Sequence, residues 1–115
     1  MSWKEFDIAG IDKGFGLSFE ISADLSKIDH TDWFIVPAGV RSLTVTVTPS
    51  NGASAIVQTT TDLVNNIKDD DFEVSYTDWV AGEVSNIYCD VTNNRVNAIR
   101  CVQLSEGNVR FTVVC

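Results

Sequence analysis

The stretch Leu43-Thr44-Val45-Thr46-Val47-Thr48 decides the fold class, because an apolar residue and a threonine alternate along its whole length. A period of two places the apolar side chains on one face of a strand and the hydroxyls on the other. The β-branched residues that follow Leu43 also suit the pleated surface of a sheet. The stretch therefore predicts a strand with one buried and one solvated face.

The same alternation recurs on both sides of this run. It appears in four further stretches, Phe15–Ile21, Phe72–Tyr76, Ile87–Thr92 and Val109–Val113. Three more strands are predicted by their apolar, β-rich composition, at Trp33–Val36, Ala53–Thr60 and Val96–Leu104. Turn residues separate the runs at Pro37-Ala38-Gly39, Pro49-Ser50-Asn51-Gly52, Asn93-Asn94 and Ser105-Glu106-Gly107-Asn108.

These short strands predict an all-β fold. Parallel sheets bury both faces and lose the alternation, so the strands should be antiparallel. We expect a single antiparallel β-sandwich, or a flattened barrel, of about seven to nine short strands joined by hairpins. The Pro49–Gly52 segment is interpreted as one of these tight hairpin loops.

Two segments depart from the pattern. Thr61–Ile67 has a capping residue followed by apolar positions at helical spacing, which fits either a single helical turn crossing between sheets or an irregular crossover. In Met1–Gly14 the apolar residues follow neither a strand nor a helix period; they are Trp3, Phe6, Ile8 and Ile11. Residues 1–14 are therefore either an edge strand or an arm whose four apolar side chains bind a partner. Residues 15–115 form the sandwich domain.

The length and the net charge of the chain limit the classes of function that it can have. The 115 residues suit one domain, and 8 basic against 16 acidic residues leave a net charge of −8. That sign disfavours nucleic acid and anionic membranes as partners, since both are bound by basic residues. The sequence shows no secretory signal and no long apolar run, so we expect a protein made in a cytoplasm and not secreted.

The three cysteines are Cys89, Cys101 and Cys115. Their number is odd, and no metal-binding spacing is present. We expect free, mostly buried thiols, with Cys89 and Cys101 on or near the core face. One alternative is a pair between Cys89 and Cys101, if these lie on neighbouring strands and become oxidised, and another is an intermolecular disulfide at Cys115.

No pattern indicates catalysis. His30, the only histidine, lies in a polar loop, and neither a nucleophile motif nor a glycine-rich phosphate loop is present. Asp69-Asp70-Asp71 invites a calcium site, but the spacing does not match an EF-hand, so a solvated loop is favoured. Asp29 with Asp32 is interpreted in the same way. We therefore predict no enzyme, no cofactor, no metal site and no catalytic residue.

Four stretches resemble small bacteriophage virion β-sandwich proteins: Val36–Val47, Asp78–Val84, Val96–Val102 and Gly107–Val113. The resemblance implies a head decoration (cement) protein or a related head or tail accessory protein, located in the virion. It implies the major capsid protein or other virion subunits as partners, and a homo-oligomer, which we predict to be a trimer.

The tryptophans suggest an alternative function. Exposed tryptophans on a β-sandwich stack on sugar rings, which would indicate a carbohydrate- or receptor-binding module of a phage tail or fibre. The candidates are Trp3, Trp33 and Trp79. Trp33 lies in an apolar run and Trp79 follows a predicted strand, so we expect at least two of the three to be structural.

Overall fold

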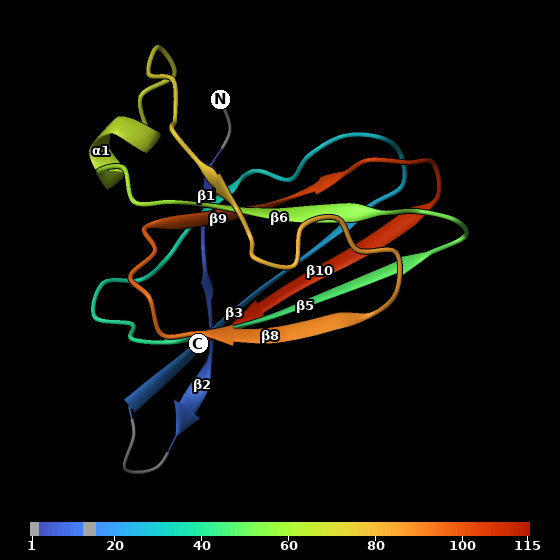
Figure 1. Ribbon diagram of the computed structural model, residues 1–115. Helices are drawn as coiled ribbons and strands as arrows, with labels where there is room; N and C mark the ends of the chain where they lie inside the picture. Colours follow the sequence, from blue (N-terminus) through green and yellow to red (C-terminus); the bar gives the residue numbers. More distant parts are fainter. Residues whose placement is uncertain (1–2, 13–15) are drawn as a thin grey trace.

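Two five-stranded sheets pack face to face in the computed structural model, which describes residues 3–12 and 16–115 (Figure 1). The predicted all-β, mostly antiparallel sandwich is confirmed. The first sheet has the strand order β1-β4-β9-β6-β7, with bounds Trp3–Glu5, Trp33–Ile35, Ala98–Gln103, Ala55–Thr60 and Thr77–Asp78. The second has the order β2-β3-β10-β5-β8, with bounds Asp7–Asp12, Gly16–Leu25, Asn108–Val114, Leu43–Ser50 and Tyr88–Thr92.

The strands pair in a nested series. β3 pairs with β10, β4 with β9, β5 with β8 and β6 with β7, and every one of these pairs is antiparallel. The chain from β3 to β10 is thus one long hairpin, folded so that successive pairs fall in alternate sheets. This is the strand order of a jelly roll, in which two Greek keys form two packed sheets.

The nesting corrects the expectation that short hairpins join the strands. Pro49–Gly52 links β5 in the second sheet to β6 in the first, so it is a corner between sheets. The turns at Asn93-Asn94 and Ser105–Asn108 cross between the sheets in the same way. A turn motif specifies a local reversal of the chain, but not whether the two strands then pair.

The core lies between the inner faces of the sheets. The alternation predicted for β5 and β10 is confirmed, because the side chains of Leu43, Val45, Val47, Val109, Phe111 and Val113 are all buried. The ring of Phe34 on β4 stacks on that of Phe111 across the two sheets, with 6.0 Å between centroids.

The predicted strand Phe72–Tyr76 is wrong. Only Thr77–Asp78 pairs there, and the preceding chain runs over the outer face of the first sheet. Ile67 and Val74 are buried against that face in a second apolar cluster, together with Trp33, Ile35 and Ala98. The chain follows this path because burying these side chains needs no strand partner.

The predicted helical turn is present as α1, Val64–Ile67. It joins β6 to β7 of the same sheet, so the expected crossing between sheets is wrong. The turn has no side-chain cap, and its Ile67 is fully buried. Packing of that residue against the sheet therefore stabilises the turn, as is usual for helices too short to persist alone.

The expected inner face of β8 is also wrong. Cys89 and Val91 are exposed, whereas Tyr88 and Asp90 are half-buried. The register explains the reversal: Asp90 lies opposite Val45 on β5, and cross-strand neighbours share a face. Because Val45 faces the core, the alternate, more polar residues of β8 face inward as well.

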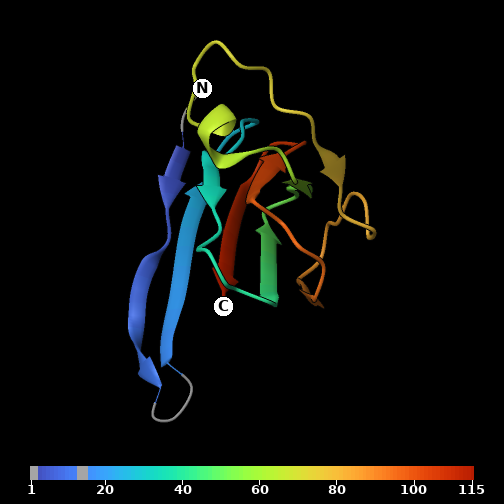
Figure 2. The same cartoon turned by 90° about the vertical axis from the view of Figure 1, so that its left-hand side faces the viewer.

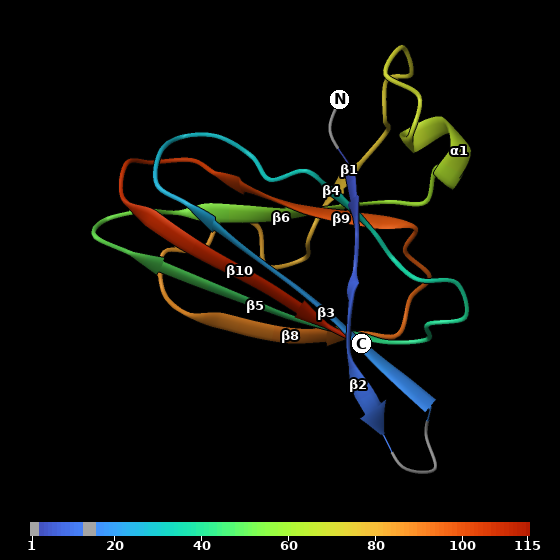
Figure 3. The same ribbon diagram turned by 180° about the vertical axis from the view of Figure 1, so that it is seen from behind.

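The N-terminal segment forms an edge strand in both sheets. β1 runs parallel to β4 in the first sheet, and β2 runs antiparallel to β3 in the second. Phe6, between the two strands, is buried in the main core. Figures 1 and 3 show the segment passing both sheets as one extended run, and Figure 2 shows β2 and the start of β3 projecting beyond the rest of the body.

The three cysteines are free. Cys101 on β9 is buried as expected, but Cys89 is exposed and lies in the other sheet, which corrects its predicted place on the core face. Cys115 is half-buried. None of the helices among residues 3–12 and 16–115 is long and apolar enough to cross a membrane.

We predict that iodoacetamide alkylates Cys89 in the native protein but reaches Cys101 only after unfolding. Burial raises the pKa of the Cys101 thiol to about 12, so the reactive thiolate is scarce as well as shielded. Mass spectrometry of native and denatured protein measures both sites. Equal labelling rates at Cys89 and Cys101 in the native state would contradict the burial of Cys101.

The turn between β9 and β10 requires glycine at position 107. Its φ is +137°, and a Cβ there would lie 2.6 Å from the Ser50 carbonyl oxygen and 2.7 Å from the Ala53 nitrogen. Both are backbone atoms of the neighbouring β5–β6 corner and cannot rotate away. The buried Gln103 amide donates hydrogen bonds of 2.9 Å to the Ser105 and Gly107 carbonyls, which hold the turn together. The Ser105 hydroxyl donates to the Gly52 carbonyl at 3.1 Å, which joins the turn to that corner.

We predict that Gly107→Ala lowers the free energy of unfolding by about 2 kcal/mol or more, from backbone strain and the clash together. Gly82→Ala is the matched control, because Gly82 also has a positive φ of +64°, but a Cβ added there would meet no atom within 4 Å. It should lose only about 1 kcal/mol, the cost of the left-handed conformation. Urea unfolding compares the two, and equal losses would show that the close approach at Gly107 carries no cost.

Candidate functional site

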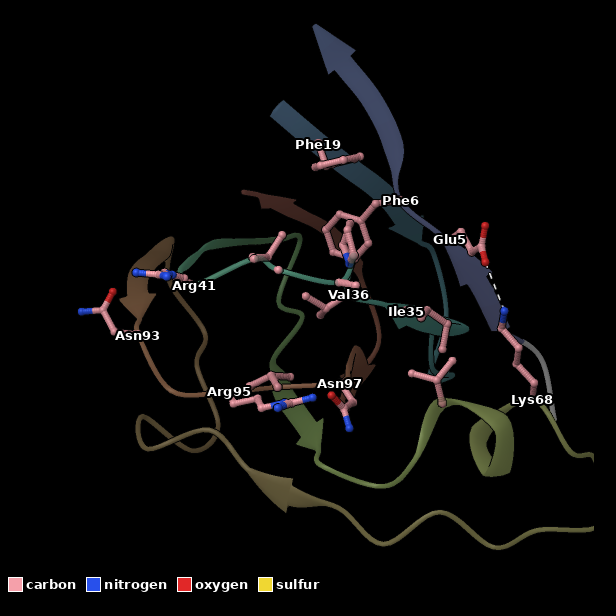
Figure 4. Close-up of a pocket in the computed structure, with 16 residues that line it drawn as sticks. Glu5, Phe6, Phe19, Ile35, Val36, Arg41, Lys68, Asn93, Arg95 and Asn97 are labelled. Carbon is pink, nitrogen blue, oxygen red and sulfur yellow. Dashed lines mark hydrogen bonds and ion pairs between the residues drawn. The ribbon is translucent and has the colours of Figure 1, made fainter. Parts of the chain in front are cut away.

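A groove of about 980 Å³ opens at one end of the sandwich (Figure 4). Four parts of the chain form it: the β1–β2 junction, β3, the loop between β4 and β5, and the loop between β8 and β9, with α1 at one side. The groove therefore exists only because the nested pairing brings the loops of two successive strand pairs to the same end.

The floor of the groove is apolar. Phe6 and Val36 belong to the main core and expose only 8% and 9% of their surface, and Phe19 is half-buried beside them. Pro37 begins a tight turn, in which the Val40 N–H donates to the Pro37 carbonyl at 3.4 Å. This turn raises the β4–β5 loop above the floor as one wall of the groove.

Two arginines stand on the walls. Arg41 comes from the β4–β5 loop and Arg95 from the β8–β9 loop, and both are exposed. Within residues 3–12 and 16–115, neither arginine has a hydrogen-bonded or ion-paired side chain. Figure 4 shows both on the side of the groove away from Glu5 and Lys68.

The other end of the groove is neutralised. Lys68 of α1 forms an ion pair with Glu5 at 3.1 Å, and the same ammonium group lies 4.4 Å from the centre of the Trp3 ring. These contacts attach β1 to α1. The charges of Lys68 and Glu5 thus cancel at one end of the groove, whereas the other end carries the positive charges of the two arginines.

The two loops that carry the arginines are fixed to each other. The Val36 N–H donates to the Asn97 carbonyl at 3.0 Å, which joins the β4–β5 loop to the β8–β9 loop. The Asn97 side-chain amide donates to the carbonyls of Thr61 and Asp62 at 3.0 and 2.9 Å. The two loops that carry the arginines are therefore joined to each other near their bases.

A second, smaller hollow of about 610 Å³ lies between β7 and β8, and Arg95 and Val96 border both hollows. Here the Asp90 carboxylate accepts hydrogen bonds from the Trp79 indole at 2.9 Å and the Tyr88 hydroxyl at 2.8 Å. Trp79 also donates its backbone N–H to the Val57 carbonyl at 2.8 Å. Because Val57 and Asp90 belong to different sheets, Trp79 ties the two edges together.

The structure separates the four apolar residues predicted for the N-terminal arm. Trp3 and Ile8 are exposed, by 39% and 64%, whereas Phe6 faces the core. The side chain of Ile11 lies outside the described part of the molecule. Phe6 therefore contributes to the floor of the groove and to the domain interior, and Trp3 and Ile8 are the members that another molecule can reach.

The three tryptophans offer less to a sugar than the sequence suggested. Trp33 is buried, with the Arg100 guanidinium 4.5 Å from its ring centre. Trp79 is half-buried and uses its indole N–H on Asp90. Trp3 has Lys68 over its ring. Their roles in packing and in linking elements account for most of their surface.

The polar candidates make local contacts. The Nδ1 of His30 lies 2.8 Å from the Thr31 carbonyl oxygen, and an Asp29 carboxylate oxygen accepts the His30 N–H. An Asp69 carboxylate oxygen accepts the Asp71 N–H at 3.0 Å. Among the residues that the structure describes, no group of three or more His, Cys, Asp or Glu side chains could hold a metal ion.

The comparisons with known proteins add no relative: no family model, no curated protein and no solved structure matches this chain. The resemblance to phage virion proteins therefore stays a prediction from the sequence.

Sequence reasoning missed the groove arginines. Arg41 and Arg95 are far apart in the chain and belong to no motif, so only the fold brings them to one site. One signal was available, since each is a basic residue in or beside a turn segment of an otherwise acidic chain. That signal indicates an exposed positive charge, but not that the two charges share a groove.

We predict that the hydrogen bonds to Asp90 make the free energy of unfolding depend on pH in the acidic range. Hydrogen bonds from Trp79, Tyr88 and the Val91 N–H lower the pKa of Asp90 below its ordinary value of 3.8. A carboxyl whose folded-state pKa is lowered stabilises the fold above its unfolded pKa, and this contribution is lost as the pH falls through the folded value.

The test compares wild type with Asp90→Asn by urea unfolding between pH 7 and pH 2. Wild type should be the more stable at pH 7, and its advantage should shrink below about pH 4, near the ordinary pKa of an aspartate. The Trp79 indole resonance should titrate over the same range. A constant stability difference throughout would contradict the role of the charged carboxylate.

Proposed function

We propose that the chain is a non-enzymatic structural subunit of a bacteriophage virion, a decoration or cement protein that binds the head shell. The jelly-roll strand order supports this proposal, because virion proteins are among those that use it. Since one fold serves many functions, the proposal needs support from a surface as well.

The observation that carries the proposal is the N-terminal segment on the edges of both sheets. β1 and β2 are the terminal strands of their sheets, so each presents an edge without a further strand among the described residues. Trp3 and Ile8 are exposed on this segment. Unpaired strand edges with apolar side chains are surfaces that other chains extend by strand addition.

The energetics of a decorated shell fit a small interface of this kind. An aromatic anchor buried at an interface contributes about 2 kcal/mol or more, and repeated copies on a shell multiply a modest affinity. The net charge of −8 keeps free copies apart before assembly. The partners would be the major capsid protein or other virion subunits, and the protein would act as a homo-oligomer, for which we propose a trimer.

The carbohydrate- or receptor-binding alternative has less support. It rested on exposed tryptophans, and Trp33 is buried, Trp79 is hydrogen-bonded to Asp90, and Trp3 is covered in part by Lys68. We therefore place the shell-binding role first.

We predict that the protein sediments with assembled shells when it is expressed together with the major capsid protein of its parent genome. The double variant Trp3→Ala, Ile8→Ala should reduce the bound fraction by about tenfold or more, since one lost anchor already costs that much affinity. Both side chains lie on edge strands outside the main core, and the Lys68–Glu5 ion pair still attaches β1 to α1 when Trp3 is removed. The variant should therefore unfold near the wild-type temperature. Gradient sedimentation followed by gel densitometry measures the bound fraction.

The control variant is Val80→Ala, Ile87→Ala, which removes two apolar side chains that are 92% and 70% exposed on the opposite edge. It should bind like wild type. Shells that carry no copies of the wild-type protein would overturn the proposed function. Full binding of the Trp3→Ala, Ile8→Ala variant would place the contact elsewhere. Deletion of residues 1–11 is a poorer test, because it removes Phe6 from the core.

A further inference from the structure

We propose that the groove between the β4–β5 and β8–β9 loops binds a short acidic segment of another protein. The carboxylates of that segment would pair with Arg41 and Arg95, and an apolar side chain would cover the half-buried Phe19 beside Phe6. The proposal goes beyond the shell-binding role, because it concerns a different surface from the exposed face of the N-terminal strands and holds whichever protein supplies the segment.

Charge is the first argument. The residues lining the groove include three basic side chains, Arg41, Lys68 and Arg95, but only one acidic side chain, Glu5. Lys68 and Glu5 are paired with each other, which leaves two positive charges without a partner among the described residues. The whole chain carries −8, so this groove departs in sign from the rest of the molecule. A guanidinium fork matches a carboxylate with two parallel hydrogen bonds.

The floor is the second argument. A lone small anion would satisfy the arginines but would leave Phe19, Pro37 and Val40, which are only half-buried, in contact with water. The groove, at about 980 Å³, has room for several side chains. A segment that combines carboxylates with an apolar side chain uses both features, because burial of apolar surface is favourable in proportion to the area covered.

The charge of the body selects against the other polyanions. A nucleic acid would also bring negative groups to the arginines, but each added phosphate meets the repulsion of a protein with net charge −8. A short segment with a few carboxylates has less charge to bring close. Peptide is therefore the class that the charges and the floor favour together.

The groove is also preorganised. The hydrogen bond from Val36 to the Asn97 carbonyl joins the loops that carry the two arginines, and Asn97 is in turn held to Thr61 and Asp62. Figure 4 shows the apolar side chains between the arginine side of the groove and the Glu5–Lys68 pair. Less ordering is required of walls that are already fixed, which favours binding.

The experiment titrates the ¹⁵N-labelled full chain with the capped peptide Gly-Asp-Glu-Leu-Phe-Asp-Glu-Gly. Its matched control is the amide peptide Gly-Asn-Gln-Leu-Phe-Asn-Gln-Gly, which keeps the shape and loses the charge. Amide resonances of residues 36, 38–41 and 93–97 should shift with the acidic peptide. The amide peptide should bind about tenfold more weakly or worse, because charge-assisted hydrogen bonds are about twice as strong as neutral ones.

The double variant Arg41→Ala, Arg95→Ala should weaken binding of the acidic peptide by about tenfold or more, as expected for the loss of two charge-assisted contacts. The control Lys27→Ala, Arg110→Ala removes the same charge at exposed positions outside the groove and should bind like wild type. Both variants should unfold at the wild-type temperature, since these side chains make few contacts.

Four results would overturn the proposal. The first is the absence of amide shifts in the two groove loops with millimolar acidic peptide, and the second is equal binding of the two peptides. The third is equal weakening of binding by the two double variants. The fourth is displacement of the acidic peptide by an equimolar ten-nucleotide oligothymidylate. A concentration-dependent dimer that is lost only in Arg41→Ala, Arg95→Ala would identify a second copy as the occupant and would equally contradict it. None of these outcomes bears on sedimentation with shells, so the two proposals fail independently.

Discussion

The contact between Phe34 and Phe111 joins the two sheets at their centre, and the rest of the molecule is arranged around it. Phe111 belongs to β10, which pairs with β3 on one side and β5 on the other, so the second sheet is built outward from this strand. Phe34 belongs to β4, beside β9 in the first sheet. Two sheets that share one apolar interior must also close their open edges, and the chain does so differently on each side.

At one edge of the sandwich the polypeptide chain itself connects the two sheets, and at the other edge hydrogen bonds connect them. The N-terminal segment passes from β1 in the first sheet to β2 in the second, with Phe6 inserted into the core between them. On the far side, Trp79 reaches from the end of β7 to Asp90 on β8. The first closure places Trp3 and Ile8 on the outside, and its junction residue forms part of the groove floor. The exposed strand edges thus follow from how this side is closed, whereas the groove also needs the β4–β5 and β8–β9 loops.

Period-two alternation was a reliable guide where both neighbours of a strand were strands. β5 and β10 follow their predicted faces because each lies inside the sheet and has only one wet side. The guide failed at the borders. The face of β8 is set by its register with β5, and the chain at Phe72–Tyr76 packs on a sheet without joining it. An edge strand or a covering loop can contain the same alternating residues, so only its neighbours decide the outcome.

The candidate site could not be predicted from the sequence, because it also depends on which strands become neighbours. Arg41 and Arg95 share a groove because β4, β5, β8 and β9 belong to two successive nested pairs. Nesting was not predicted, since the turn motifs that separate the strands are equally compatible with simple hairpins. By contrast, Phe6 and Trp3 could be singled out from local pattern alone, although not their opposite orientations.

The nesting has a consequence for how the chain folds. The strand at the centre of the second sheet, β10, is the last of the ten to be synthesised, and it pairs with β3 across a separation of 90 residues, as in the contact of Ser22 with Thr112. Until Asn108–Val114 has left the ribosome, β3 and β5 have no common partner and their apolar faces stay uncovered. Folds dominated by such distant pairings are slow to form and exposed to aggregation while they wait. The threonines and serines that line the outer faces of β3, β5 and β10 would then keep the unpaired strands in solution during that interval.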